Sequence, residues 1–249
     1  MTPALEALLD ELVQGVRELL GDRFVGAYLQ GSFATGEADE WSDVDFVVVT
    51  TEMIEPQLVQ PLHEELYAKP TPWAQHLEGS YIPAPLLRRV DPSRTPLPFL
   101  DNGSSRLVWD PHCNTAVVRS ILREHGIALA GPDPRELVDP VSPDDLRAEA
   151  RIALADYVEW ALEPAAMTAW KQTYLVYTLC RILRTLEHGD VRSKRASCEW
   201  ALATRDERWH GLIERALVDR PEPWRKVRER ADPALERETR AFADAVSRR

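Results

Sequence analysis

Hydrophobic residues near the start of the chain recur three and four residues apart, as in Leu5, Leu8, Leu9 and Leu12. This spacing places them along one side of a helix, so we expect an amphipathic helix that ends at Gly21. Three later segments are short and rich in Val, Tyr and Phe, which is the composition of β-strands. These expected strands cover Arg23–Gln30, Val44–Thr50 and Ala74–Ile82, and a helix over Gln57–Tyr67 is expected between the last two.

Prolines are frequent from Pro83 to Gly103, and we interpret this stretch as a loop because proline has no backbone N–H to donate. One more strand is expected over Ser104–Asp110 and one more helix over Val117–His125. A second proline-rich stretch, "GPDPRELVDPVSPDDL", is interpreted as a linker. We therefore expect two domains, residues 1–140 and residues 141–249.

Beyond this boundary the pattern changes to long segments with helical period. The expected helices cover Pro143–Leu162, Ala166–His188, Ser193–Thr204, Asp206–Val218 and Pro233–Val246. The fold class that follows is an α/β N-terminal domain with a mixed sheet, joined to an all-α C-terminal helical bundle. Such a pairing favours an active cleft between the two halves.

Two carboxylates stand at the mouth of the second expected strand, in the order Ser42, Asp43, Val44, Asp45. Because side chains alternate along a strand, the two aspartates should project to the same side, roughly 6.5 Å apart. A divalent cation would remove their mutual repulsion, and Mg²⁺ is the usual ion where carboxylates and substrate phosphates supply the oxygens. This arrangement is typical of in-line transfer at phosphorus.

The first expected strand ends in Gly31 and Ser32, where backbone N–H groups and a hydroxyl can be aimed at phosphate oxygens. Glu78 stands at the centre of the third expected strand, where an unpaired acid would be costly. It could bind metal or act as general base on an acceptor hydroxyl. An ion pair with a basic residue such as Arg88 remains an alternative for Glu78, and a capped turn remains one for the aspartates.

The chain carries 41 acidic and 30 basic residues, which gives a net charge of -11 and a pI near 5.1. This balance argues against a sequence-independent grip on nucleic acid and favours a small cationic partner. The three cysteines are widely separated, without the spacing of a disulfide framework or a zinc site. With no signal peptide and no apolar run of roughly 18 residues, we expect a cytoplasmic protein without membrane contact. We also expect a monomer.

The order Gly-Ser and then Ser-Asp-x-Asp in "GSFATGEADEWSDVD" resembles the signature of the nucleotidyltransferase superfamily with the polymerase β-like fold. The segments "LEGSYIP", "GPDPRELVDPVSPDDL" and "TLCRILRTLEHGDVRSKRASCEWAL" are similar to the aminoglycoside adenylyltransferase family of the spectinomycin/streptomycin type, with its C-terminal helical domain. The resemblance covers most of the chain. It implies transfer of AMP from ATP, the co-substrate, to a hydroxyl of an aminoglycoside-like small molecule, with pyrophosphate released.

The resemblance also implies site residues. It assigns catalysis and metal binding to Asp43, Asp45 and Glu78, with Glu78 as the base, and nucleotide binding to Gly31, Ser32, Ser42 and Lys194. Lys194 has independent support, because Ser193 is a good N-cap and would place the lysine beside the positive end of a helix. An ordinary solvated basic face is the alternative for Lys194. Closure of the helical domain over ATP would follow.

The resemblance weakens where substrate choice is decided. Antibiotic-modifying members place acidic or polar groups at the start of the helix that holds "TLCRIL", whereas this chain has "AWKQTY", with Lys171. Lys171 would repel a cationic aminoglycoside. The acceptor could therefore be a protein or an endogenous metabolite, and a nucleotide-binding regulatory module without turnover is a third hypothesis.

Overall fold

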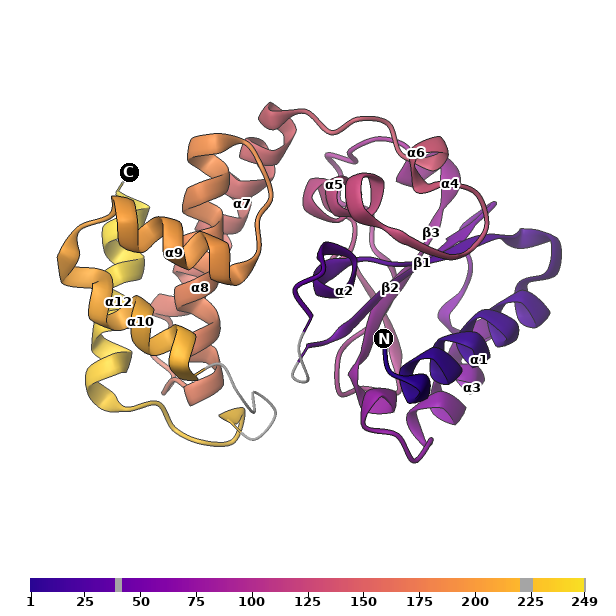
Figure 1. The fold of residues 1–249 in the computed structure, drawn as a ribbon, viewed down its shortest axis with the longest axis horizontal. Helices are drawn as coiled ribbons and strands as arrows, with labels where there is room; N and C mark the ends of the chain where they lie inside the picture. Colours follow the sequence, from indigo (N-terminus) through magenta and orange to yellow (C-terminus); the bar gives the residue numbers. More distant parts are fainter. Residues whose placement is uncertain (39–41, 220–225, 249) are drawn as a thin grey trace. The chain divides into compact units, whose positions relative to one another are not determined.

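The computed structural model describes residues 1–38, 42–219 and 226–248, and the chain divides into two compact units, Met1–Val141 and Ser142–Arg249 (Figure 1). The first unit combines strands and helices, and the second is helical. No helix in the described part of the chain is long and apolar enough to span a bilayer.

The first unit contains six strands and several helices among its described residues. The strands are β1 (Phe24–Leu29), β2 (Val44–Thr50), β3 (Leu77–Pro83), β4 (Leu97–Leu100), β5 (Leu107–Asp110) and β6 (Ile127–Ala130). The α-helices are α1 (Pro3–Leu20), α2 (Gly31–Thr35), α3 (Pro56–Tyr67), α4 (Ala84–Leu87), α5 (Ala116–His125) and α6 (Pro134–Leu137), with 3-10 turns at Gly21–Arg23 (η1) and Pro72–His76 (η2).

These strands form one sheet in the order β5-β4-β3-β2-β1-β6. The β2 and β3 strands run parallel, while the neighbouring pairs on either side are antiparallel. A parallel pair needs a crossover connection, and α3 supplies it. The mixed sheet and the helical second unit confirm the fold class predicted from the sequence.

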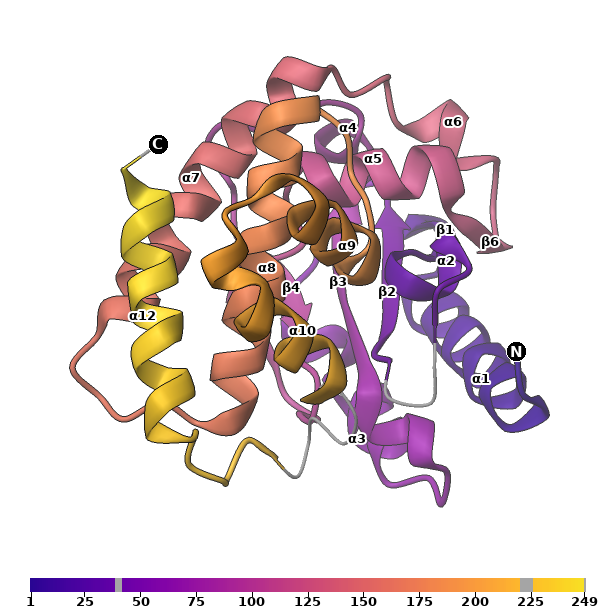
Figure 2. The same ribbon diagram turned by 60° about the vertical axis from the view of Figure 1, so that its left-hand side comes forward.

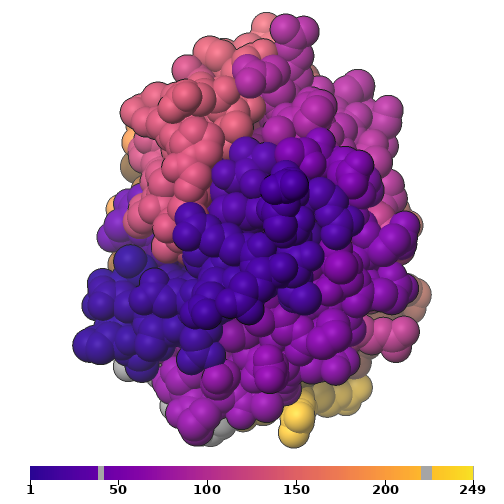
Figure 3. Space-filling view, turned by 90° about the vertical axis from the view of Figure 1, so that its right-hand side faces the viewer, coloured from indigo at the N-terminus to yellow at the C-terminus, as the bar shows by residue number. Residues whose placement is uncertain are grey.

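The central strands are buried on both faces. Phe46 of β2 packs in one core with α1 and α3, whereas its neighbour Val47 packs in another with α4, α5 and α6. Helices of the two layers can be followed on either side of the sheet in Figure 2, and the indigo surface of α1 crosses the face drawn in Figure 3. Because both faces are covered, β2 is an almost unbroken apolar run after its first residues.

Helix α1 forms as its pattern predicts. Thr2 caps the first turn by accepting a hydrogen bond from the Leu5 N–H at 3.3 Å, and Pro3 occupies the first helical position. Gly21 ends the helix with a positive φ of 53°. The apolar stripe is buried against the sheet, and Leu12 and Val16 have no exposed surface.

The structure corrects three expectations for this unit. The third strand begins at Leu77, because Pro72 starts a 3-10 turn that takes up the residues before it. The stretch from Pro83 to Gly103 is not one loop, since it contains α4 and β4. Strand β4 accommodates Pro98 because its ladder to β3 uses Phe99 and Leu100 instead. Strand β6, which pairs with β1, was not predicted because its four residues are too few for a periodic pattern and lie directly before the proline-rich stretch.

The second unit is built from α7 (Pro143–Leu162), α8 (Ala169–His188), α9 (Lys194–Thr204), the 3-10 turn η3 (Glu207–Trp209), α10 (His210–Asp219) and α12 (Pro233–Ser247). Its apolar core draws on α7, α8, α9, α10 and α12. Two boundaries differ from prediction by more than one residue. Helix α8 starts after its N-cap Thr168 rather than at Ala166, and the segment from Asp206 opens with a 3-10 turn before α10.

Candidate active site

Two acidic residues lie opposite each other on the parallel strands β2 and β3. Asp45 of β2 and Glu78 of β3 are register partners, so their side chains project from the same face of the sheet. Adjacent strands lie about 4.8 Å apart, so two carboxylates on one face of neighbouring strands are close enough to repel each other. Glu78 keeps 16% of its side chain exposed. The pair is therefore a strongly negative position that solvent or a substrate can reach.

Ser42 and Asp43 come directly before β2. Ser42 is buried and Asp43 is half-buried. The β2–β3 ladder begins one residue later, at Val44 opposite Leu77. The shared orientation of Asp43 and Asp45 therefore stays a prediction from strand alternation, whereas the pairing of Asp45 with Glu78 is part of the ladder.

Gly31 packs directly against the Asp45 carboxylate. A Cβ at position 31 would lie 1.9 Å from Asp45 Oδ2, and the φ of Gly31 is 63°, in the left-handed region that favours glycine. The preceding Gln30 N–H donates to the Asp45 carbonyl oxygen at 3.0 Å, which ties the two segments together. Gly31 also opens the short helix α2, in which Ser32 is the second residue and is half-buried. The predicted glycine, serine and aspartate are thus brought to one place.

The ion-pair partner of Glu78 is a histidine. His112 Nε2 lies 3.5 Å from Glu78 Oε1, and the hydrogen bond that Glu78 accepts from His112 raises the pKa of His112 above its usual range. The alternative pairing with Arg88 is wrong, because Arg88 Nη1 contacts Asp139 Oδ1 at 3.2 Å. No sequence motif marks His112, and its place just after β5 was the only available signal.

The pKa values of two further residues show the effect of negative charge beside Glu78. Burial raises the pKa of Asp101, and the negative charge of Glu78 raises it further. Burial also raises the pKa of the Cys113 thiol, and the charges of Glu78 and Asp45 add to that increase. Both acids therefore act on the same buried thiol, which agrees with their shared face. Neither Asp101 nor Cys113 was picked out from the sequence.

The arrangement of Asp45 and Glu78 suits a metal ion whose remaining ligands come from a bound substrate. Within residues 1–38, 42–219 and 226–248, no group of three or more His, Cys, Asp or Glu side chains forms a metal cage by itself. Mg²⁺ at phosphate-transfer sites is usually held by one or two carboxylates together with substrate phosphates and water. The Asp45 and Glu78 pair, with Gly31 in close contact with the Asp45 carboxylate, suits such an ion. Metal binding by Asp45, Glu78 and Asp43 stays a prediction.

Lys194 is the first residue of α9 in the helical unit. Ser193 is the N-cap, as predicted, because its side chain accepts from the Ala196 N–H at 3.0 Å. The Lys194 ammonium lies 5.1 Å from the centroid of the Tyr177 ring and 5.8 Å from that of Tyr174. Cation–π contact and the helix N-terminus thus set the position of this charge. Its role toward the nucleotide stays a prediction.

Lys171 does not present the bare charge that its sequence position suggests. It is 9% exposed, its Nζ lies 3.0 Å from Glu163 Oε2, and it stands 4.5 Å above the Trp160 ring. The repulsion of a cationic substrate expected from Lys171 is therefore largely cancelled by Glu163. Trp160 and Trp170 join a continuous aromatic cluster with ring centroids 6.1 Å apart.

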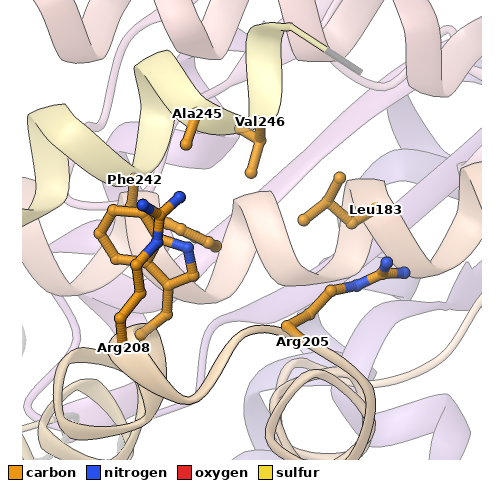
Figure 4. A pocket seen from close by; sticks show the side chains of 7 residues that line it. Leu183, Arg205, Arg208, Phe242, Ala245 and Val246 are labelled. Carbon is orange, nitrogen blue, oxygen red and sulfur yellow. The ribbon is translucent and has the colours of Figure 1, made fainter.

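The helical unit also contains a shallow pocket, shown in Figure 4. It is small, with a volume of about 50 Å³, and is lined by Leu183, Arg205, Arg208, Trp209, Phe242, Ala245 and Val246. Both arginines already have acidic partners, since Arg205 bonds to Glu187 and Arg208 to Asp206. None of the predicted site residues lines this pocket.

Comparison with known proteins assigns both units to described families. The model of the nucleotidyltransferase domain matches residues 9–82, and the model of the aminoglycoside adenylyltransferase C-terminal domain matches residues 136–248. A spectinomycin 9-adenylyltransferase of Staphylococcus aureus is 26% identical, with 75% of this chain and 74% of that protein aligned. An aminoglycoside (3'') (9) adenylyltransferase of Klebsiella pneumoniae is 26% identical over 78% and 77% of the two chains.

The fold has a close counterpart among solved structures. Spectinomycin adenyltransferase AAD(9) from Enterococcus faecialis, solved with ATP and spectinomycin, matches with a TM-score of 0.72 over 98% of this chain and 99% of its own. At 14% identity this match establishes the fold. The family models and the relatives identify an enzyme of nucleotidyl transfer, which confirms the resemblance read from the motifs. Along most of its length the chain thus resembles the aminoglycoside adenylyltransferase family of nucleotidyltransferases.

Proposed function

We propose that this enzyme uses Mg²⁺ to transfer AMP from ATP to a hydroxyl of an aminoglycoside-like small molecule. The observation that carries the proposal is the Asp45–Glu78 register pair with Gly31 packed against the Asp45 carboxylate. Two acids on one face of a sheet, next to a glycine-led turn, are the arrangement that phosphate chemistry uses. The related adenylyltransferases act on spectinomycin or aminoglycosides by name.

In the proposed reaction Glu78 removes the proton of the acceptor hydroxyl as general base. The acceptor oxygen then forms a bond to the α-phosphorus of ATP, and the bond between that phosphorus and the bridging oxygen to the β-phosphate breaks. Pyrophosphate leaves with the electron pair, and the acceptor carries AMP. Glu78 suits this role because part of its side chain is exposed at the edge of the acid face.

The acids would also hold the metal. Asp43 and Asp45, with Glu78 beside them, are the proposed ligands of Mg²⁺, and a bound Mg²⁺ neutralises phosphate charge as the transfer proceeds. Asp45 is the residue most strongly tied to this role, because the backbone of its segment is fixed to Gln30 and its carboxylate faces Gly31.

Nucleotide binding is proposed for both units. Gly31 and Ser32 would offer backbone N–H groups and a hydroxyl to the triphosphate, with Ser42 beside them. Lys194 would reach the same phosphates when the helical unit closes over ATP. The charge of Lys194 stands at the N-terminus of α9, where the helix dipole adds to it.

The acceptor is proposed to be cationic for two reasons. The chain carries a net charge of -11, which attracts a small cation over long range. Lys171, the residue that argued against such an acceptor, is paired with Glu163 and stacked on Trp160.

The test is a transfer assay with α-labelled ATP and Mg²⁺. The acceptors are spectinomycin, streptomycin and other aminoglycosides, with a metabolite mixture and a cell lysate as separate arms. We expect label on an antibiotic, located by mass spectrometry, with one pyrophosphate released per AMP transferred. Label on a lysate protein or metabolite alone would replace the proposed acceptor class. ATP binding without pyrophosphate release in every arm would defeat the proposal.

Two variants sharpen this assay. Asp45→Asn keeps the size of the side chain and removes the charge, so we expect turnover to fall by at least about 100-fold while the protein stays folded. Asp10→Asn is the matched control, because Asp10 is an exposed residue of α1. It removes the same charge far along the chain and should leave turnover unchanged.

A further inference from the structure

The residue that faces Glu78 has no role in the chemistry described so far. His112 directs Nε2 at Glu78 Oε1 over 3.5 Å, and 52% of its side chain is exposed. Its ring stacks on Phe99, with centroids 5.0 Å apart and planes inclined by 29°. The imidazole is thus held between an aromatic face and a carboxylate.

The backbone that carries His112 is fixed at both of its ends. The His112 N–H donates to Asp110 Oδ1 at 2.8 Å, at the end of β5. On the other side Asn114 is 1% exposed, and its amide nitrogen donates to Asp91 Oδ2 and to the Thr95 carbonyl, each at 2.9 Å. A loop tied in this way presents a side chain in a defined position at low entropic cost.

A buried arginine, Arg119, holds the Asn114 side chain in place. Arg119 has no exposed surface, and its Nη2 donates to Asn114 Oδ1 at 2.6 Å and to the Leu86 carbonyl at 2.9 Å. Arg119 Nε donates to the Leu87 carbonyl at 3.1 Å. The turn that holds His112 is therefore connected through Asn114 to the end of α4 and to α5.

We propose that His112 is a positioning residue that holds the carboxylate of Glu78 for the attack of the acceptor hydroxyl. This inference rests on the proposed function, in which Glu78 is the base. Glutamate has several rotamers of similar energy, and only some direct an oxygen toward the acceptor. Contact from His112 Nε2 to Oε1 selects one of them and leaves Oε2 for the acceptor proton. The stacking on Phe99 fixes the ring that makes the selection.

The effect should be seen in turnover rather than in nucleotide binding. His112 would act on the base through contact with Glu78, while the triphosphate is assigned to Gly31, Ser32 and Lys194. Loss of a residue that orients a reactive group commonly costs about 10- to 100-fold in activity. We therefore expect kcat to fall by that factor in His112→Ala, while the KM for ATP changes by less than about twofold.

The experiment compares three variants of the full chain. His112→Ala removes the contact, and His112→Gln supplies an amide nitrogen that can contact Glu78 in place of Nε2. The matched control is His188→Ala, since His188 Nε2 makes a similar contact with Glu187 Oε1 at 3.7 Å in the helical unit. We expect His112→Gln to regain most of the lost kcat and His188→Ala to match the original protein. Thermal unfolding of all three checks that they are folded.

Two kinetic results would overturn the inference. One is an unchanged kcat in His112→Ala, and the other is an equal loss in the alanine and glutamine variants. A crystal structure of His112→Ala gives a readout that does not depend on turnover, because the Glu78 carboxylate should leave its original rotamer. An unmoved carboxylate also counts against the role. If the original protein transfers AMP to no acceptor, the proposed function fails while the crystal structure still decides whether His112 holds Glu78.

Discussion

Gly31 and Asp45 approach each other so closely that any side chain at position 31 would collide with the carboxylate. The position of a Cβ on residue 31 is 1.9 Å from Asp45 Oδ2 and 2.6 Å from Asp45 Cγ. A carboxylate in this situation cannot move aside without leaving the face that it shares with Glu78. The glycine is thus required by the geometry of the acid and also by its own positive φ.

Gly31→Ala should therefore lower activity strongly and stability only modestly. The positive φ costs roughly 1–2 kcal/mol for alanine, and the collision displaces the Asp45 carboxylate. We expect turnover to fall by at least about 100-fold. Gly36→Ala is the matched control, because Gly36 has a φ of 75° but nothing within 4 Å of its added Cβ. Equal activity losses in the two variants would mean that backbone strain, and not the Asp45 contact, is responsible.

Lys194→Ala should weaken the binding of ATP. The ammonium is the charge proposed to reach the triphosphate, so its loss should raise the KM for ATP by about 10-fold or more, equivalent to about 1.4 kcal/mol. Arg195→Ala is the control, since Arg195 is the exposed neighbour on the same helix and its removal changes the net charge equally. Steady-state kinetics with varied ATP concentration measures the KM for ATP in both variants. A KM that rises alike in both variants would assign the effect to overall charge.

Much of the fold could be predicted because local signals were strong. Helix α1 has a regular apolar stripe, a capping threonine and a terminal glycine, so its end at Gly21 was predictable. The failures occurred where tertiary pairing overrides composition. Strand β4 contains Pro98 and still forms between β3 and β5, because the strands on either side supply the pairing. Strand β6 is only four residues long, and its pairing with β1 leaves no periodic signal in the sequence.

The candidate site was predictable only as far as its residues form an ordered motif. Gly31, Asp45 and Glu78 could be chosen because glycine and acids stand at the ends and centres of expected strands. Strand register, which sequence does not state, sets Asp45 opposite Glu78. His112 escaped notice because its contact with Glu78 joins residues 34 positions apart through β4 and β5. Lys171 was misjudged because its pairing with Glu163 depends on how α8 follows α7.

Arg119→Met should destabilise the first unit strongly. The guanidinium has no exposed surface and satisfies the carbonyl groups of Leu86 and Leu87. Methionine fills a similar volume but leaves these buried acceptors unsatisfied, at a cost of about 1–3 kcal/mol for each group left unpaired. Chemical denaturation should show a loss of about 3–5 kcal/mol. Exposed Arg106→Met is the control, and a loss in Arg119→Met no larger than in that variant would contradict the argument.

His63 should make the protein lose stability as the pH falls. Its side chain is buried against Phe46, its Nε2 lies 2.7 Å from the Tyr81 hydroxyl, and burial lowers the pKa of His63 to about 3. An unfolded histidine titrates near pH 6.5, so the unfolded state binds the proton first, and stability falls from about pH 6.5 down to about pH 3. At pH 5 this amounts to roughly 2 kcal/mol.

His63→Phe removes this titration while keeping a ring against Phe46. We expect the difference in unfolding free energy between pH 7 and pH 5 to be about 2 kcal/mol smaller in His63→Phe than in the original protein, because all other titrating groups are common to both. The Tyr81 hydroxyl loses its partner in this variant, which lowers stability equally at both pH values. His125→Phe, at the exposed end of α5, should leave the pH dependence unchanged. If His63→Phe keeps the full loss of stability between pH 7 and pH 5, the acid sensitivity arises from other groups and His63 is protonated without cost.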